Sequence, residues 1–504
     1  METATLVYEF YNGSTWVDIS ADVLATPAPK WSRGLGSDSP SSLVAASGSL
    51  TFFLNNSAFS IGGVAGYYSP DNSNAVAGFD LGANVRVKST YSATDRYQFY
   101  GRISSITPTM GRYRDRKTEV VVRDYMHELE ERNVDILALQ TSKRSDELLT
   151  TLIAAMDVAP LATSYDNGVG AYTLSFFDLQ GEKQTAISVV QRIVQGDMSR
   201  VWVVGDATGG ETLKLVNRHD DIGKTSSLTL NDTMEGMTIS RKRSGITNNA
   251  IVTMQTPIPG TANEVIYTLP IEKTISAGQS WTFTAQHRDP DGGARITASN
   301  VVSPSASTDF SFSSVSGSGE DFNAYLSVAI SKGADRTELT LTNTHPTRTG
   351  YLWFFQLRGI VLRLRDPIEI ATTDATSITA YGEKTLRYSG SYQSNENTAK
   401  SISEFIIYKY KDPRTEIANV SFTGNKNATL MAGAVNLDLG DMITTVETQT
   451  GINSDRIIIN KSVTIIGGQL WRVELLTSFS KDDAYWLLGT AGFSELGQTT
   501  TLGF

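Results

Sequence analysis

The segment from Asp455 to Leu476, DRIIINKSVTIIGGQLWRVELL, constrains the fold more than any other part of the sequence. Apolar residues recur at every second position on both sides of Gly467-Gly468. Because successive side chains of a strand point to opposite faces, this period of two predicts two strands that each bury one face. The glycine pair can adopt the positive φ of a tight turn. We therefore expect a β-hairpin that buries Ile457, Ile459, Val463, Ile465, Trp471, Val473 and Leu475.

Residues 1–132 show a similar pattern of short strands separated by turn residues. TLVYEFY and TWVDIS flank Asn12-Gly13, which predicts another hairpin. We expect a loop at 32–49 and a turn at 70–72. Further strands are expected in SLTFFLNN, NVRVKSTY, RYQFYGRISSI and KTEVVVRD. The pattern is typical of a β-barrel or β-sandwich.

The character of the sequence changes after Asp124, where helical periodicity replaces the strand pattern. Ser145 can cap a helix that carries Asp146 and Glu147 in its first turn. A second helix is expected from Thr185 to Gly196. The apolar faces are Leu148, Leu149, Leu152, Ile153 and Met156 in the first helix, and Ile187, Val190, Ile193 and Val194 in the second. Together with a hairpin in VWVVGDATGGETLKLVNR, these helices predict a small α/β module at 133–240.

The region 263–363 again predicts strands only, including AYLSVAIS and TELTLTN, so we expect an inserted β-sandwich domain. A strand in NNAIVTMQTP precedes it, and 257–261 is expected to be a linker. Behind the insertion, Thr398 can cap a helix that ends before Asp412-Pro413. The helix would bury Ile402, Phe405 and Ile406.

Length, composition and charge exclude several classes of protein. A chain of 504 residues predicts three or four domains. It has no cysteine, which excludes disulfides and thiolate metal sites. A net charge of −10 argues against a protein that coats nucleic acid, although an acidic wall would let a duplex slide past. We find no secretion signal and no run of ~20 apolar residues, and expect a soluble protein made in a reducing cytoplasm, without membrane insertion.

The candidate catalytic residues form no known motif. His127, His219, His287 and His345 lie far apart, and none belongs to a metal-binding spacing such as HExxH. RHDD at 218–221 is the one local cluster with acid–base potential. It has no second ligand or nucleophile nearby, which favours a solvated loop.

Three other stretches invite a functional interpretation. DPDGG at 289–293 begins like a calcium loop but lacks the Glu that the twelfth loop position needs, which favours a β-turn. SRGLGSDS at 32–39 lacks the lysine of a phosphate-binding loop. RYRDRK at 112–117 is interpreted as a charged hairpin tip, with a partner-docking loop as the alternative. We therefore predict no catalytic residue, no cofactor and no metal site.

Several segments, in order, resemble the baseplate hub or tail-tip (minor tail) proteins of long-tailed bacteriophages. In the first domain these are WVDISADV, AASGSLTFFLNN, YYSPDN, NVRVKSTY and YQFYGRISSITPTMG. VWVVGDATGGETLKLVNR, DATSITAYGEKTL (with Ser377, Tyr381 and Gly382), YKYKDP, LDLGDMITTVE, the hairpin at 455–476 and the closing YWLLGTAGFSELGQTTTLGF follow in family order. The inserted region matches the family least well.

The resemblance implies a mainly β protein with two tail-tube-like β-barrels, a small α/β module and an inserted β-sandwich domain. The expected domains are 1–132 (first barrel), 133–240 (α/β), 241–262 with 364–504 (second barrel) and 263–363 (insertion). A homotrimer would form a pseudo-sixfold ring at the virion's tail tip, assembled in the host cytoplasm. Its partners would be the distal tail protein, tail tube, tape-measure protein and tail fibre or spike, and the genome would pass its lumen without specific binding.

Two alternatives stay open, namely a distal tail protein ring and a carbohydrate-binding or depolymerase β protein. We expect no enzyme activity, and no lysozyme-like or peptidase domain is recognised. In the closing segment, 486–488 is expected to form a final barrel strand. The glycine-spaced stretch 492–504 is expected to be ordered against the ring or a neighbouring subunit.

Overall fold

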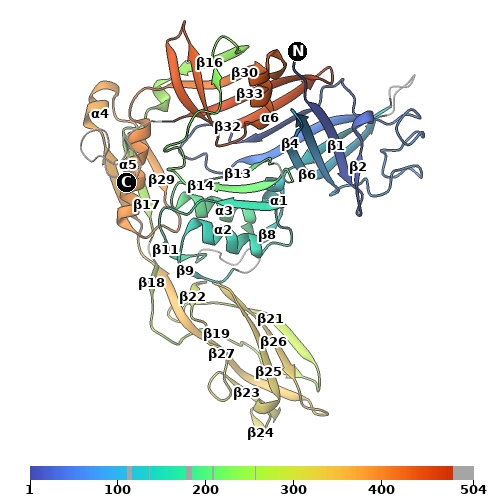
Figure 1. Ribbon diagram of the computed structural model, residues 1–504. Coiled ribbons are helices and arrows are strands. Elements are labelled where there is room, and N and C mark those ends of the chain that lie inside the picture. The colour runs from blue at the N-terminus through green and yellow to red at the C-terminus, as the bar shows by residue number, and fades with distance from the viewer. Residues whose placement is uncertain (110–115, 135–136, 178–183, 207–208, 256, 481–504) are drawn as a thin grey trace.

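One large open sheet organises the molecule (Figure 1). The computed structural model describes residues 1–480 except 110–115, 135–136, 178–183, 207–208 and 256, and residues 481–504 lie outside the description. Thirteen described strands form the sheet in the order β16-β30-β33-β32-β3-β4-β7-β6-β5-β1-β2, with β31 beside β32 and β15 beside β31. They are β1 (Thr5–Tyr11), β2 (Trp16–Asp18), β3 (Lys30–Gly34), β4 (Ala46–Asn55), β5 (Asn84–Tyr91), β6 (Thr94–Thr109), β7 (Lys117–Arg123), β15 (Thr229–Leu230), β16 (Gly236–Arg241), β30 (Thr415–Thr423), β31 (Met442–Glu447), β32 (Ile452–Ile466) and β33 (Leu470–Phe479).

The first and last parts of the chain are joined within this sheet. β3 pairs antiparallel with β32, so that Arg33 lies opposite Lys461. Close to this junction the rings of Trp31 and Trp471 pack edge to face, with centroids 5.8 Å apart. The fold is mainly β, as predicted, but the described strands form no closed barrel. The two expected barrels are instead the two ends of one sheet, because β3 pairs with β32 as well as with β4.

The predicted hairpin at 455–476 is confirmed as β32 and β33. Gly467 and Gly468 have φ of 60° and 80°, and Ile465 pairs with Trp471. All seven side chains expected on its buried faces are buried. The hairpin of β1 and β2 and the strands β4 to β7 also lie where the sequence predicts them.

Two expected connections differ in extent from the prediction. The predicted loop at 32–49 is confirmed only for residues 35–45, because its first three residues belong to β3 and its last four to β4, and these strand ends pair with each other. The predicted linker at 257–261 contains β18 (Pro257–Pro259), which pairs with β27 (Gly350–Leu364). Proline is tolerated in such a short strand at the edge of a sheet.

The α/β module lies beneath the large sheet in Figure 1. Its sheet has the order β10-β14-β13, with β10 parallel to β14. The predicted hairpin is confirmed as β13 and β14, although residues 207 and 208 of its turn lie outside the described residues. The module contains α1 (Tyr125–Glu131), β8 (Asn133–Val134), β9 (Gln140–Lys143), α2 (Ser145–Ala154), β10 (Ala162–Tyr165), β11 (Tyr172–Ser175), β12 (Gln184–Thr185), α3 (Ala186–Gln195), β13 (Arg200–Val204) and β14 (Thr212–Val216).

Both predicted helices of this module are present. α3 follows Thr185 and ends at Gly196, as predicted. Ser145 does not cap α2 but is its first residue, because its hydroxyl donates to Asp197 Oδ2 at 2.6 Å. The buried face of α2 contains Leu148, Leu149, Leu152 and Ile153, whereas Met156 follows the helix.

A third layer covers the side of the α/β module, at the left of Figure 1. It consists of the sheet β28-β17-β29 and the helix α5. The elements are β17 (Asn249–Met254), β28 (Ile368–Thr373), α4 (Ala375–Tyr381), β29 (Thr385–Ser389) and α5 (Glu396–Tyr410), and α6 (Ala428–Asn436) lies near the large sheet. Asn395, not the predicted Thr398, caps α5, because the Asn395 side chain accepts from the backbone of Asn397 and Thr398.

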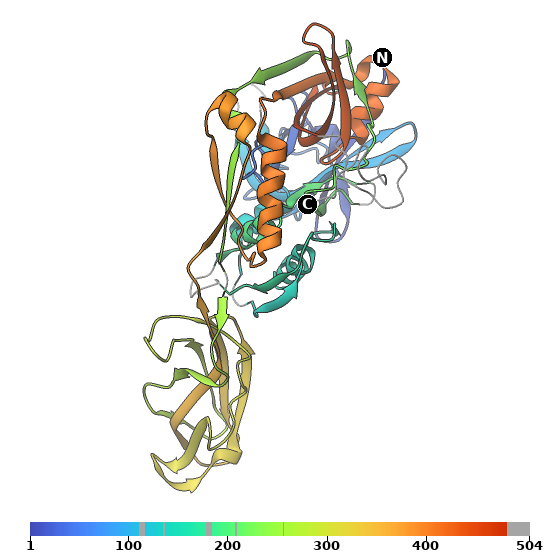
Figure 2. The same cartoon turned by 90° about the vertical axis from the view of Figure 1, so that its left-hand side faces the viewer.

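The inserted domain forms a separate lobe at one end of the molecule (Figures 1 and 2). Two sheets enclose their own apolar core, distinct from the continuous core of the remaining chain. Besides β18 and β27, they contain β19 (Glu264–Thr268), β20 (Lys273–Ile275), β21 (Ser280–Gln286), β22 (Thr297–Ser299), β23 (Phe310–Val315), β24 (Ser318–Asp321), β25 (Leu326–Lys332) and β26 (Arg336–Asn343). Ala334 N donates to Leu137 O at 3.2 Å, which ties this lobe to the α/β module.

A core substitution in the inserted domain should therefore affect that lobe alone. Phe355 is fully buried in its core, and Phe355→Ala should destabilise the lobe by about 3–5 kcal/mol. Differential scanning calorimetry should show one transition moving to lower temperature while the others stay. Trp353→Ala on the same strand is the control, because Trp353 is 46% exposed. A uniform shift of all transitions would contradict two independent cores.

Candidate functional site

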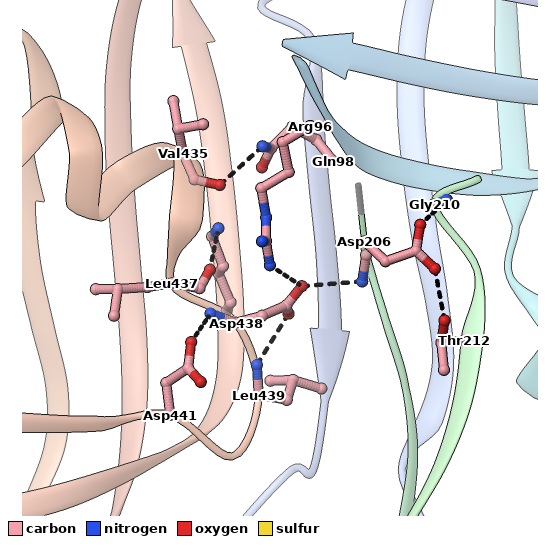
Figure 3. Close-up of polar contacts among 12 residues, drawn as sticks. Arg96, Gln98, Asp206, Gly210, Thr212, Val435, Leu437, Asp438, Leu439 and Asp441 are labelled. Carbon is pink, nitrogen blue, oxygen red and sulfur yellow. Dashed lines mark hydrogen bonds and ion pairs between the residues drawn. The ribbon is translucent and has the colours of Figure 1, made fainter. Parts of the chain in front are cut away.

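The strongest candidate site is a buried polar junction centred on Asp438, in the motif Leu437-Asp438-Leu439-Gly440-Asp441 (Figure 3). The motif connects the end of α6 to the start of β31. Its own backbone fixes the loop, because Leu439 N donates to Asp438 Oδ1 at 2.9 Å and Asp438 N donates to Asp441 Oδ2 at 2.8 Å. The Asp438 carboxylate is thereby held pointing at the neighbouring segments.

Three distant segments meet at the Asp438 carboxylate. Arg33 Nη2 of β3 donates to Asp438 Oδ2 at 2.9 Å, and both side chains are at least nine-tenths buried. Gly205 N, just after β13, donates to the same oxygen at 2.9 Å. Arg96 Nη2 of β6 lies 3.8 Å from it. One carboxylate therefore connects the N-terminal strands, the α/β module and the C-terminal strands.

Only glycine fits at position 205. A Cβ atom there would lie 2.4 Å from the Tyr97 carbonyl oxygen and 2.7 Å from Arg33 Nη2. The carboxylate of the next residue, Asp206, accepts from Gly210 N at 2.9 Å and Thr212 Oγ1 at 2.6 Å (Figure 3). The hydrogen bonds to Asp206 thus stabilise the hairpin of β13 and β14 close to Asp438.

A buried lysine completes the junction. Lys461 of β32 is 1% exposed, and its Nζ donates to Ala434 O at 3.0 Å and Leu437 O at 2.6 Å. Burial lowers the pKa of Lys461 to about 7, although the Asp438 charge acts in the opposite direction. Nearby, Gln98 Nε2 donates to Val435 O at 2.9 Å, which ties β6 to the end of α6 (Figure 3).

The histidines singled out in the sequence lie in four separate places. His127 on α1 lies 3.3 Å from Glu131, and His345 stacks on Phe322 with ring centroids 4.8 Å apart. His287 is buried, which lowers its pKa to about 4, and its ring contacts Ala334 O and Thr337. His219 accepts from Arg218 Nε at 3.2 Å.

The remaining candidate stretches are placed as follows. Asp289 and Asp291 of DPDGG both accept from Arg363, so a guanidinium lies where a cation would bind. SRGLGSDS supplies Arg33 to the junction, a role that its sequence did not indicate. Positions 112–115 of RYRDRK lie outside the described residues. Within the described ranges, no three His, Asp or Glu side chains lie close enough together to hold a metal ion. No helix in this part of the chain is long and apolar enough to cross a membrane.

No protein-family model matches this chain, and no curated protein matches it. Solved structures do resemble it. A tail protein from Neisseria meningitidis MC58 is 10% identical, with a TM-score of 0.49 over 95% of this chain and 99% of that one. The 43 kDa tail protein of prophage MuSo2 from Shewanella oneidensis is 10% identical, with a TM-score of 0.46 over 94% and 98%. Prophage tail protein gp18 from Listeria monocytogenes EGD-e is 8% identical, with a TM-score of 0.44 over 94% and 95%. All three are described as tail proteins, and two of them come from prophages.

Removing the carboxylate of Asp438 should destabilise the main body strongly. Asp438→Ala leaves the buried Arg33 without its ion-pair partner, a change that costs about 3–5 kcal/mol. Chemical denaturation followed by tryptophan fluorescence should show a lower midpoint. Glu369→Ala is the control, because its pair with Arg387 is exposed and worth less than about 1 kcal/mol. Equal effects of the two substitutions would contradict a central role for Asp438.

The pKa of Lys461 predicts a pH dependence. The pKa of Lys461 is about 7 in the folded protein and 10.5 for an ordinary lysine. Between these two pH values the unfolded chain therefore binds more protons at this position than the folded protein does. As a result, this lysine makes the free energy of unfolding rise with pH above about 7. The difference in stability between the natural chain and Lys461→Met should change by up to about 1.4 kcal/mol per pH unit from pH 7 to 9. Denaturation midpoints across this range measure it, with exposed Lys400→Met as control. A constant difference would contradict the prediction.

Proposed function

We propose that this chain is a structural hub protein at the tip of a phage tail, and that three copies form a pseudo-sixfold ring. One observation carries the proposal. Four of the segments that resemble hub proteins lie far apart in the sequence yet meet at the Asp438 junction. They contain Gln98, Gly205, Asp438 and Lys461. If these segments resembled hub proteins only by chance, they would not be expected to contact one another in the structure. Contact among them is expected if they stabilise a fold that hub proteins share.

The junction suits a protein that bears load rather than one that turns over a substrate. The Asp438 carboxylate is buried and paired with Arg33, and the Lys461 ammonium is buried and hydrogen-bonded to two carbonyls, so these groups hold the sheets together and are not available to a small molecule. A ring through which a genome passes must keep its shape while its neighbours pull on it. The single continuous sheet and the central ion pair make the N-terminal and C-terminal strands move as one body.

The edge strands of the large sheet could form the contacts between the subunits of the ring. Among the described strands, the order ends at β2 on one side and at β16 on the other. An edge strand presents backbone donors and acceptors that another chain can pair with. Contacts between unlike edges of successive subunits close into a ring when the rotation between them is right. The proposed neighbours are the tail tube and distal tail protein on one side and the fibre or spike on the other, with the tape-measure protein in the lumen.

The mass of the assembled protein tests this proposal. Native mass spectrometry of the purified chain should give a species of three times 54.7 kDa that grows with concentration at the expense of monomer. Asp438→Ala should shift the balance toward monomer, because it loosens the body that presents both edges. A hexamer would favour the distal tail protein instead, and a monomer at all concentrations would contradict ring formation by this chain alone.

A further inference from the structure

The inserted lobe contains a cavity of about 700 Å³ between the edges of its two sheets. It is flanked by β19 from one sheet, by β21 from the other, and by the short segments that follow these strands. Arg288 N donates to Ile266 O at 2.7 Å, which joins the two sides at one end. The lobe projects from the rest of the molecule (Figures 1 and 2). Sites that hold a small molecule have volumes of roughly 300–1,000 Å³, so this cavity is large enough for one.

One aromatic ring lines the cavity and is fixed by the core of the lobe. Tyr267 of β19 is half-buried, and its ring packs against Phe283 with centroids 6.0 Å apart. Phe283 packs in turn edge to face against the core residue Phe355. The Tyr267 ring lines the cavity together with Val265 and Ile266. A ring that is held in this way can stack on the flat apolar face of a ligand.

The polar part of the lining offers both donors and acceptors. The Gln286 side-chain oxygen accepts from Arg295 Nε at 3.2 Å, so the N–H groups of this amide remain for another partner. Arg288 is exposed and donates from Nη1 to a backbone carbonyl at 2.9 Å, so its guanidinium keeps further donors. The hydroxyls of Thr268 and Thr284 can both donate and accept.

Asp289 adds a carboxylate whose position is already fixed. Its Oδ1 accepts from Arg363 Nη2 at 2.8 Å, and its Oδ2 accepts from Arg363 Nε at 3.1 Å. The turn that follows is closed by Gly293 N, which donates to Asp289 O at 2.7 Å. Because these groups are in place before a ligand arrives, binding does not have to order them.

Positive and negative charges balance at the cavity. Among the described residues, its charged lining side chains are Arg288 and Asp289. The charged side chains that are hydrogen-bonded to the lining, directly or through Arg363, are Arg295, Arg363, Glu264 and Asp291. An anion would therefore approach carboxylates as well as guanidiniums, and so would a cation. The cavity suits a ligand without net charge.

The strand edges beside the cavity are protected against pairing with a further strand. Among the described strands, β19 pairs only with β27 and β21 only with β26, so each has one unpaired edge. However, β19 has a bulge between Val265 and Tyr267, and Pro270 and Pro290 follow the two strands. Bulges and prolines keep an edge from accepting another strand. A compact ligand bound by side chains therefore fits the cavity better than an extended peptide.

We propose that this cavity binds a neutral oligosaccharide. The apolar face of one sugar ring stacks on Tyr267, and the sugar hydroxyls exchange hydrogen bonds with Gln286, Arg288 and Asp289. Hydroxyl groups both donate and accept, as the mixed lining requires, and they carry no charge. This binding site goes beyond the proposed role as a ring subunit and does not depend on it, since the lobe has its own core.

Saturation-transfer NMR on the full chain tests the proposal with four neutral probes, namely maltotriose, cellotriose, mannotriose and triacetylchitotriose. At least one should bind with a dissociation constant of about 1 mM or lower. Tyr267→Ala should weaken this binding by about tenfold or more, whereas Tyr267→Phe keeps the ring and should retain most of it. Trp353→Ala is the matched control and should change nothing, because Trp353 is an exposed aromatic residue of the same lobe outside the cavity.

A second variant keeps the test decisive if Tyr267→Ala disturbs the fold of the lobe. Arg288 is exposed, so Arg288→Ala should leave the melting transition of the lobe in place and still weaken binding by about threefold or more. Absence of binding by all four sugars would overturn the proposal. So would binding that survives Arg288→Ala unchanged, or binding that is lost in Trp353→Ala.

Two further probes test the chemical class of the ligand. The anionic trisaccharide of galacturonate and the cationic trisaccharide of glucosamine should each bind more weakly than the best neutral sugar. Tighter binding of either would overturn the assignment of a neutral ligand. Binding of a strand-forming peptide of alternating threonine and valine, without binding of any sugar, would assign the cavity to strand pairing instead.

Discussion

The structure depends on one requirement, that the buried charge of Arg33 meets the buried charge of Asp438. A charge removed from water is tolerated only when it is paired and hydrogen-bonded. Pairing fixes the position of β3 against the loop before β31, and the same carboxylate fixes the end of β13 through Gly205 N. Parts of the chain that are 405 and 233 residues apart are thus placed together by one side chain.

The inserted domain stands outside this arrangement. It has its own core and its own two sheets, and hydrogen bonds such as Ala334 N to Leu137 O join it to the α/β module. Changes in this lobe can therefore be accommodated without disturbing the junction. The region in which the sequence resembles hub proteins least is also the one with a separate core.

Local structure could be predicted from the sequence, and long-range pairing could not. The hairpin at 455–476, α3 and the strands of the inserted domain follow from period, turn residues and glycine positions. The pairing of β3 with β32 cannot be predicted from either segment alone. The alternation of apolar and polar residues shows that each segment is a strand, but it does not specify the strand with which it pairs. The two barrels came from the resemblance, and the pairing that joins them into one open sheet of described strands could not be read from either strand alone. Ser145 was mistaken for a cap because its actual partner, Asp197, lies 52 residues away. The expected domain boundaries stay a prediction, and so do the strand at 486–488 and the ordering of 492–504, which lie outside the described residues.

The central claim is that a rigid body built around Asp438 serves as the ring at a tail tip. The most direct test is the symmetry and the neighbours of this chain in electron-microscopy images of intact particles. The account predicts threefold density between a sixfold ring and the fibre or spike, into which the body fits with β3 and β32 paired. Density for this chain with sixfold symmetry, or its absence from the tail tip, would contradict the account.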